Sequence, residues 1–341
     1  SILMPARNAE AWIGEAIASV QAQTDSDWEL IAVDDGSDDG TLGVLQHAAA
    51  GDRRIRVSST EGGRRGIAAA LGRALAESRS PLVARMDADD RSHPERLAKQ
   101  RALLDARENL FAAGCLVEAF PQAHVRDGMR RYLRWQNSLV EPAEVARDRF
   151  VETTVLHPTL MMRRDLLDRL GGWRRVDWPE DFDLLLRAFE AGFEIAKVPE
   201  VLYQWRLHPA QASRCDPRYA PDAFRSARAY FLARTIARCG GRPVWILGAG
   251  PVGKRLGKAL AREGASVCGF ADIDPRKIGG RVSIGPRGGP WWPVVSMERV
   301  FAERGSAVAI AAVGQAGARE RIRSWLRERG WLEGRDFWAA A

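Results

Sequence analysis

The chain has 341 residues, enough for two domains that each bury a hydrophobic core. Its formal net charge is +7, yet only five of the 51 basic residues are lysine, and the arginines are scattered rather than gathered with aromatic residues in one stripe. The composition therefore argues against a nucleic-acid partner and is compatible with anionic ligands or with peripheral contact to a membrane surface.

The cysteines and the hydropathy pattern indicate the cellular compartment in which the protein is expected. The four cysteines are far apart in the sequence and form no Cys-x-x-Cys pair, so we expect neither a zinc site nor a disulfide framework. No apolar run approaches the roughly 20 residues that a membrane helix requires. We expect a cytoplasmic protein without a secretory signal or a transmembrane segment, for which contact with the inner face of the membrane stays open.

Strands and helices alternate at the start of the chain. Strands are expected at residues 1–8, 28–33, near 56–58 and at 83–86. Helices are expected at 11–23, after the loop 34–41, at 67–78 and from 93 onward. Such alternation is typical of an α/β fold with a mostly parallel sheet, in which ligands bind at the carboxyl ends of the strands.

Two of these strands end in clusters of carboxylates. Asp35 lies in the loop after strand 28–33, and Asp87, Asp89 and Asp90 crowd the end of the fourth strand. Like charges at a strand end favour a hard divalent cation such as Mg²⁺ or Mn²⁺. Taken alone, each cluster also fits an acidic turn that caps the following helix.

The next part of the chain is less regular. Residues 120–154 have weak periodicity and many arginines, which is typical of acceptor-binding elements but places no helix or strand. A strand at 157–162 and a helix ending near Leu170 follow, then an apolar helix that starts with two acids, and a strand pair at 198–206. Acids at a helix start also serve as caps, so this pattern leaves their role open.

The order of motifs over about residues 1–213 closely resembles the inverting nucleotide-sugar glycosyltransferases of family two, which have the GT-A fold. The resemblance rests on Met4-Pro5-Ala6-Arg7-Asn8, Val33-Asp34-Asp35-Gly36-Ser37, Met86-Asp87-Ala88-Asp89-Asp90, Gly171-Gly172-Trp173, Glu180-Asp181 and Arg206-Leu207-His208-Pro209. It implies an α/β fold of the GT-A nucleotide-diphospho-sugar transferase type for this part of the chain.

The resemblance also implies a role for individual residues. Those implied for the donor nucleotide are Pro5, Ala6, Arg7, Asp35, Arg64 and Asp87. Those implied for Mn²⁺ or Mg²⁺ are Asp87, Asp89 and His208. Asp181 is implied as the catalytic base. Two positions depart from the family, since Arg7 replaces a usual aromatic residue and the segment around Arg64 lacks a usual asparagine.

The implied activity is metal-dependent transfer of a sugar, with inversion, from a nucleoside diphosphate sugar to a hydroxyl group. A UDP-sugar is the expected donor, and a saccharide or a lipid-linked molecule is the expected acceptor, as in cell-surface polysaccharide or glycan biosynthesis. The chemistry agrees with the residues. A divalent ion offsets the charge of the leaving diphosphate, and a carboxylate deprotonates the attacking hydroxyl.

A second domain is expected at residues 241–341, joined to the first, residues 1–218, by a helical linker at 219–240. A strand at 244–247 runs into a Gly-x-Gly-x-x-Gly turn, and a helix and a second strand follow. The pattern predicts a small Rossmann-like domain, about half of the usual size, with strand 307–313 and helix 318–330 as its other clear elements. Its nucleotide site would consist of Gly248, Gly250, Gly253 and Asp272.

Two other functions remain open at this point. The glycine turn could belong to an NAD(P)-dependent oxidoreductase, or the chain could be a nucleotide-sugar binding protein without turnover. The glycines could also serve only to pack the helix on its strand.

Overall fold

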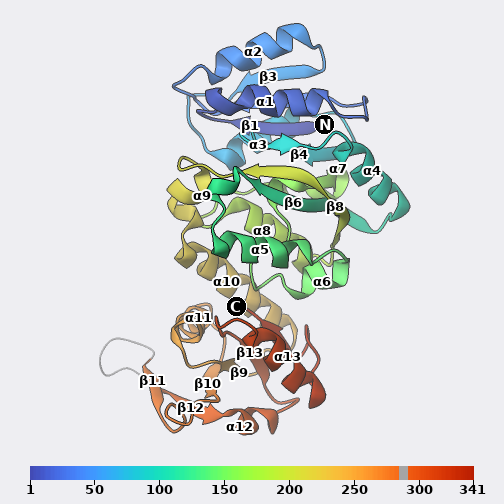
Figure 1. The fold of residues 1–341 in the computed structure, drawn as a ribbon. Helices are drawn as coiled ribbons and strands as arrows, with labels where there is room; N and C mark the ends of the chain where they lie inside the picture. Colours follow the sequence, from blue (N-terminus) through green and yellow to red (C-terminus); the bar gives the residue numbers. More distant parts are fainter. Residues whose placement is uncertain (284–290) are drawn as a thin grey trace. The chain divides into compact units, whose positions relative to one another are not determined.

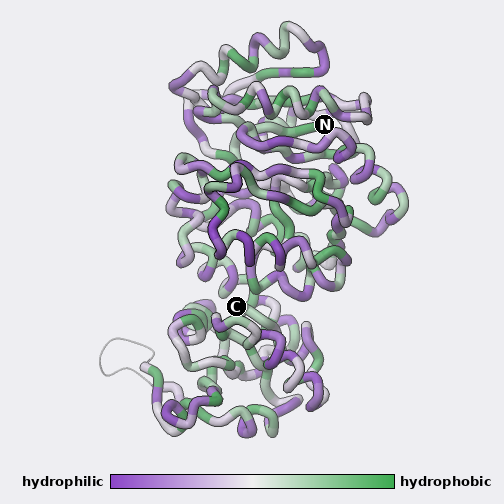
Figure 2. Tube along the Cα trace, viewed as in Figure 1, coloured by the Kyte–Doolittle hydropathy of each residue, from purple (hydrophilic) through white to green (hydrophobic). Residues whose placement is uncertain are grey.

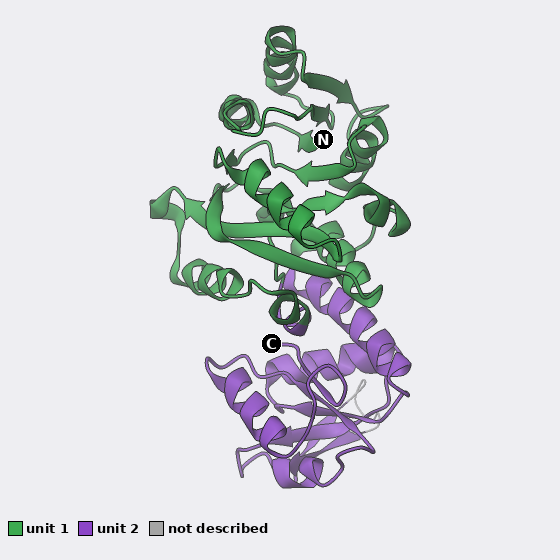
Figure 3. Ribbon diagram, turned by 90° about the vertical axis from the view of Figure 1, so that its right-hand side faces the viewer, with its two compact units in different colours: residues 1–146, 153–219 green, residues 147–152, 220–341 purple. Residues whose placement is uncertain are grey.

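A computed structural model describes residues 1–283 and 291–341. Contacts within the chain divide it into two compact units, drawn in different colours in Figure 3. Unit 1 comprises residues 1–146 and 153–219, and unit 2 comprises residues 147–152 and 220–341. Within the described residues, no helix combines the length and the hydropathy that a membrane crossing needs.

Unit 1 is built around a sheet with the strand order β3-β2-β1-β4-β7-β6-β8-β5 (Figure 1). The strands are β1 (Ile2–Ala6), β2 (Leu30–Asp34), β3 (Ile55–Ser59), β4 (Leu82–Arg85), β5 (Arg91–Ser92), β6 (Leu110–Phe120), β7 (Met161–Arg163) and β8 (Glu194–Arg206). The first four strands are parallel to one another, whereas β7 is antiparallel to β4 and β6. The sheet is therefore mixed, with a parallel half that carries the predicted loops.

Helices cover both faces of this sheet. They are α1 (Glu10–Gln21), α2 (Thr41–Gly51), α3 (Ile67–Glu77), α4 (Arg96–Ala106), α5 (Asp127–Asn137), α6 (Pro142–Arg147), α7 (Arg164–Arg169), α8 (Glu180–Glu190) and α9 (Ala212–Cys215). Alternate strand residues face opposite sides, so Met4 packs in one core cluster with α1, α2, α4 and α5, and Leu3 in another with α3, α6, α7 and α8. In Figure 2, where green marks hydrophobic residues, green stretches alternate with purple ones along the chain.

The parallel register brings the predicted loops to one edge. Ala6 pairs with Asp34 across β1 and β2, and Leu3 pairs with Arg85 across β1 and β4. The chain leaves all three strands in the same direction, so the loops that start near Arg7, Asp35 and Asp87 share the carboxyl edge of the sheet.

Two long neighbouring strands differ from the prediction. β6 is absent from the predicted elements, because its small residues around Gly114 show no strand pattern. β8 is one strand, not the expected strand pair. Cys115 pairs with Val198 but Leu116 pairs with Val201, so the register shifts beside Pro199, which cannot donate to a ladder.

Smaller differences concern element ends. The helix expected from His93 begins at Arg96, after the short strand β5. The strand expected at 157–162 starts as a 3₁₀ turn (His157–Thr159) and becomes β7 only at Met161. Residues 120–154, which the sequence leaves unplaced, form mainly α5 and α6.

Unit 2 has its own sheet, with the order β11-β12-β10-β9-β13-β14. The strands are β9 (Val244–Leu247), β10 (Val267–Asp272), β11 (Arg281–Ser283), β12 (Trp291–Ser296), β13 (Val308–Ala311) and β14 (Phe337–Ala339). All are parallel except the edge strand β11. The helices are α10 (Pro221–Arg238), α11 (Pro251–Arg262), α12 (Met297–Phe301) and α13 (Ala318–Glu328).

This sheet is larger than the sequence predicts. The sequence predicts β9, β10 and β13. It does not predict β11, β12 and β14, because these strands are short or contain proline and large aromatic residues and so show no apolar run typical of a buried strand. Taken in chain order, the five parallel strands are arranged 3-2-1-4-5, which is the order of a doubly wound dinucleotide-binding sheet. The expectation of half a Rossmann domain is therefore wrong in strand number.

Candidate active site

One cleft of about 620 Å³ in unit 1 gathers the predicted donor and metal residues. Its lining includes Pro5, Ala6, Arg7, Asp35, Arg64, Asp87, Asp89 and His208. These residues come from the end of β1 and from the loops after β1, β2, β3, β4 and β8, so the edge of the sheet predicted from the sequence is the edge where the cleft lies.

Asp35 organises the floor of this cleft. Its carboxylate accepts hydrogen bonds from the backbone N–H groups of Arg65 and Gly66, at 2.7 and 2.8 Å, and from the hydroxyl of Thr60 at 2.9 Å. A Cβ atom at Gly36, whose φ is +70°, would lie 2.8 Å from the backbone nitrogen of Arg64. Asp35 therefore fixes the glycine-rich loop as well as lining the cleft.

Asp87 is held by a buried arginine that the sequence analysis does not single out. Arg85 is only 1% exposed, and its Nη2 lies 2.6 Å from Oδ1 of Asp87. Burial raises the pKa of Asp87 and the charge of Asp89 adds to this, while Arg85 acts in the opposite direction. The ion pair thus orients Asp87 at the end of β4.

Asp89 and His208 meet across the cleft. Nε2 of His208 lies 2.8 Å from Oδ2 of Asp89, and the imidazole packs on Trp12 with ring centroids 4.0 Å apart. Nδ1 of His208 is buried and has no hydrogen-bond partner among the described residues. The structure therefore joins two residues that are far apart in sequence and that the family resemblance implies for the same metal.

Asp90 has a different position from its two neighbours. One oxygen atom of each of Asp87, Asp89 and Asp90 lies within 4.8 Å of the others, a spacing compatible with a metal ion. However, Asp90 is buried, and its oxygens already accept bonds from the hydroxyl of Tyr203, at 2.9 Å, and the backbone N–H of Arg206, at 2.7 Å. Asp90 therefore anchors the loop to β8, whereas Asp87 and Asp89 are only partly buried.

The two acids at the start of α8 have unequal surroundings. Glu180 is 1% exposed, and its Oε1 accepts a hydrogen bond from Tyr219 at 2.9 Å. Asp181 is half-buried, and burial together with the negative charge of Glu180 raises its pKa to about 7. The charge of Asp87 also raises this pKa and that of Arg85 lowers it, although Asp181 is not among the residues lining the cleft.

Several partners of the predicted residues carry no sequence signal of their own. Arg85, Trp12, Tyr203 and Tyr219 hold functional side chains in place, as described above. Only Arg85 could have been suspected, because a charged residue inside an otherwise apolar strand needs a partner.

The residues predicted for a second nucleotide site lie in unit 2. Gly248, Gly250 and Asp272 line a separate pocket there, whereas Gly253 packs against the loop, since a Cβ at this residue would lie 1.9 Å from the carbonyl oxygen of Gly248.

Comparison with known proteins identifies the first part of the chain. Residues 1–171 match the family described as glycosyl transferase family 2. EpsE of Bacillus subtilis, which carries a glycosyltransferase name, is 36% identical over 210 residues, or 60% of this chain and 72% of that protein. The O-antigen biosynthesis glycosyltransferase WbnJ of Escherichia coli is 26% identical over 239 residues, or 69% of this chain and 90% of WbnJ.

Solved structures agree on the fold. The structure of S. aureus TarS residues 1–349 in complex with UDP-GlcNAc superposes with a TM-score of 0.54 and 17% identity, covering 77% of this chain and 70% of that one. The α/β GT-A fold expected from the motifs is thereby confirmed. Since the family match spans half of the 341 residues and EpsE is 36% identical over 72% of its length, the protein belongs to glycosyl transferase family 2.

Proposed function

We propose that the protein is a metal-dependent, inverting glycosyltransferase that moves a sugar from a UDP-sugar to a hydroxyl group of a saccharide or lipid-linked acceptor. The observation that carries this proposal is the convergence of Asp87, Asp89 and His208 with the donor loops in one cleft. The names of relatives such as WbnJ support a role in cell-surface polysaccharide synthesis.

The donor end of the reaction follows from the polar groups of the cleft. Asp87, Asp89 and His208 would hold Mn²⁺ or Mg²⁺, which offsets negative charge on the leaving diphosphate. The carboxylates of Asp87 and Asp89 suit such an ion, because Mg²⁺ and Mn²⁺ prefer oxygen ligands, and Nε2 of His208 lies beside them, 2.8 Å from Asp89. Arg7 and Arg64 line the same cleft, where they would contact the nucleotide.

The acceptor end depends on Asp181. As a carboxylate it would take the proton of the acceptor hydroxyl while that oxygen attacks the anomeric carbon, and attack opposite to the leaving diphosphate inverts the configuration. Glu180 is unsuited to this role because it is buried and bonded to Tyr219.

A second cleft in unit 1, of about 660 Å³, offers a place for the acceptor. It shares Arg64, Gly66, Asp216 and Arg218 with the donor cleft, and Arg65 and Arg175 also line it. An acceptor that carries phosphate or carboxylate groups would suit this arginine-rich wall.

Three variants of the full chain test the proposal. Asp89→Asn should weaken UDP binding in the presence of Mn²⁺, because it removes a ligand charge. Asp181→Asn should leave UDP binding nearly intact and lower turnover of the donor by about 10² to 10⁴, the usual contribution of a general base. Asp165→Asn, which changes an exposed carboxylate at the start of α7, is the matched control.

Binding is measured by calorimetry, and turnover by release of UDP from a panel of UDP-sugars. Equal loss of UDP binding in the Asp89 and Asp181 variants would contradict the two roles. A protein that binds and turns over no nucleotide sugar, with or without Mn²⁺, would contradict the proposed activity itself.

A further inference from the structure

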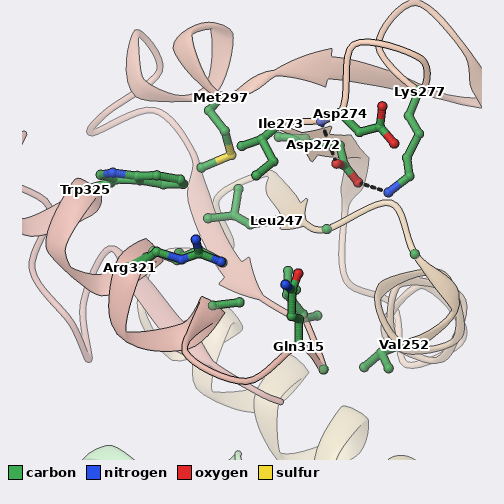
Figure 4. Close-up of a pocket in the computed structure, with 18 of the residues that line it drawn as sticks. Leu247, Val252, Asp272, Ile273, Asp274, Lys277, Met297, Gln315, Arg321 and Trp325 are labelled. Atoms are coloured by element: carbon green, nitrogen blue, oxygen red, sulfur yellow. Dashed lines mark hydrogen bonds and ion pairs between the residues drawn. The ribbon is translucent and has the colours of Figure 1, made fainter.

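A pocket of about 580 Å³ in unit 2 has no part in the proposed transfer reaction (Figure 4). It lies where the strand order of the sheet reverses, between the loop after β9 and the ends of β10 and β13. In open α/β sheets, ligands bind at this switch point. Residues of α13 close the pocket on the side of β13.

The three glycines of the turn serve different purposes. Gly248 has a φ of +114°, and a Cβ there would lie 2.6 Å from Cγ2 of Val313, so the fold itself requires glycine. Gly253 is likewise required, because α11 packs directly on the β9 loop. Gly250 is different, since its φ of −83° and ψ of −178° suit any residue and a Cβ would meet no atom within 4 Å.

Gly250 is therefore not explained by packing within the described residues. It lines the pocket directly before α11, where Pro251 has no N–H and the N–H groups of Val252 and Gly253 have no partner within the helix. A glycine at this point leaves the backbone open to close approach by a bound anion.

The walls of the pocket combine one unpaired cation with apolar surface. Arg321 is exposed to solvent, its guanidinium points toward the interior of the pocket, and no ion pair or side-chain hydrogen bond holds it within the described residues. Trp325 and Met297 lie together on one side, and Ile273 is 64% exposed at the end of β10. An anionic group next to a flat, apolar group would match these surfaces.

Asp272 marks the opposite wall. Its oxygens accept bonds from the N–H of Ala249, at 2.9 Å, the N–H of Asp274, at 3.0 Å, and the ammonium of Lys277, at 2.9 Å. The carboxylate is thus fixed at the end of β10, where such sheets bind a ribose hydroxyl. A negative charge there disfavours a phosphate on the same ribose.

The geometry points to a second nucleotide site in unit 2, which takes a ribose diphosphate with free ribose hydroxyls. The diphosphate lies against Gly250 and the start of α11 with Arg321 as its counter-ion, the ribose meets Asp272, and the base lies on the apolar wall. No His, Tyr, Cys, Ser or Thr is among the lining residues described, so the pocket offers little for hydride transfer. The site binds and does not catalyse.

Calorimetry on the full chain in EDTA tests this site, because the donor cleft is proposed to need a metal. The probes are UDP, ADP, NAD⁺ and NADP⁺, which share the ribose diphosphate but differ in base and in the 2′-phosphate. The variants are Gly250→Val and Arg321→Ala. The control is Arg255→Ala, an exposed arginine on α11 outside the pocket.

We expect at least one of UDP, ADP and NAD⁺ to bind. Which of them binds most tightly shows which base the site recognises. Gly250→Val should abolish this binding with little change in melting temperature, Arg321→Ala should weaken it about tenfold, and Arg255→Ala should leave it unchanged. NADP⁺ should bind more weakly than NAD⁺.

Three results would overturn the inference: no binding of any probe below about millimolar concentration, binding that both pocket variants leave intact, or NADP⁺ binding as tight as that of NAD⁺. None of these depends on the transferase reaction, which is measured with Mn²⁺ and the Asp89 variant.

Discussion

Two adjacent carboxylates at the start of α8 have been given opposite environments by the fold. Glu180 is closed off by Tyr219, and one of its oxygens is a buried atom without a partner among the described residues. Asp181 keeps contact with solvent, yet burial and the neighbouring charge raise its pKa to about 7. A general base whose pKa lies near the working pH is largely deprotonated and is still basic enough to take a proton from the acceptor hydroxyl.

This pKa predicts a pH dependence. Since the carboxylate is the active form of Asp181, kcat/KM for the acceptor should be constant above pH 7 to 8 and fall about tenfold per pH unit below about 7. The test is a pH profile of the initial rate at saturating donor and metal, for the natural chain and for Asp165→Asn. An unchanged rate down to pH 5 would show that Asp181 does not act as the base.

Local sequence was sufficient to predict the elements of the parallel half of unit 1. There, the strands carry apolar residues on both faces of the sheet, with Leu3 and Ile31 on one of them. Each strand is followed directly by a polar loop. The same cause made the loops of Asp35 and Asp87 predictable as neighbours. β6 and β8 could not be predicted in the same way, because their pairing and the bulge beside Pro199 depend on contacts between strands far apart in sequence.

The residues that hold the site in place were equally hidden. Asp90 belongs to the predicted motif, but its role as an anchor depends on Tyr203 in β8, more than a hundred positions away. A sequence motif therefore indicates which groups meet the substrate, whereas the groups that orient them are fixed by the tertiary structure.

The start of α8 depends on another acid, Asp183, which ties the helix to the preceding turn. Asp183 is fully buried and accepts bonds from Arg174 at 2.8 Å and from Arg187 at 2.7 Å, and Arg187 also donates to the carbonyl of Gly172. Burial acts to raise the pKa of Asp183, but the bonds from the two arginines outweigh it and lower the pKa below the usual 3.8.

We predict that Asp183→Ala lowers the free energy of unfolding by about 3 kcal/mol at pH 7, because Arg187 loses its buried counter-ion. The folded-state pKa is depressed, so this contribution is present above pH 3.8 and is lost as the pH falls further. Urea unfolding at pH 7 and near pH 3 measures both effects. The exposed Asp177→Ala is the control, and a loss that does not shrink in acid would contradict the ion-pair explanation.

At the scale of the whole molecule, neither unit is one continuous stretch of the sequence. Residues 147–152 are counted with unit 2 although unit 1 residues precede and follow them. Within this segment Asp148 is 1% exposed and forms an ion pair with Arg323 of α13, which also bonds Glu333 at 2.8 Å. Because Arg323 lies far toward the C-terminus, removing the last 100 or so residues would deprive the segment of this partner.

The ion pair of Arg323 gives a test of this interleaving in the full chain. Arg323→Met keeps the apolar volume but removes a buried cation that pairs with the buried carboxylate of Asp148, so we predict a loss of about 3 kcal/mol in the free energy of unfolding. Arg327→Met, which removes the exposed partner of the same Glu333, should cost at most about 1 kcal/mol. Differential scanning calorimetry of both variants, and of Arg323→Met combined with Asp148→Asn, measures these losses. The double variant should recover part of the stability, since it also removes the buried negative charge that Arg323 pairs with. Equal losses in the Arg323 and Arg327 variants would mean that the segment 147–152 is not held by this pair.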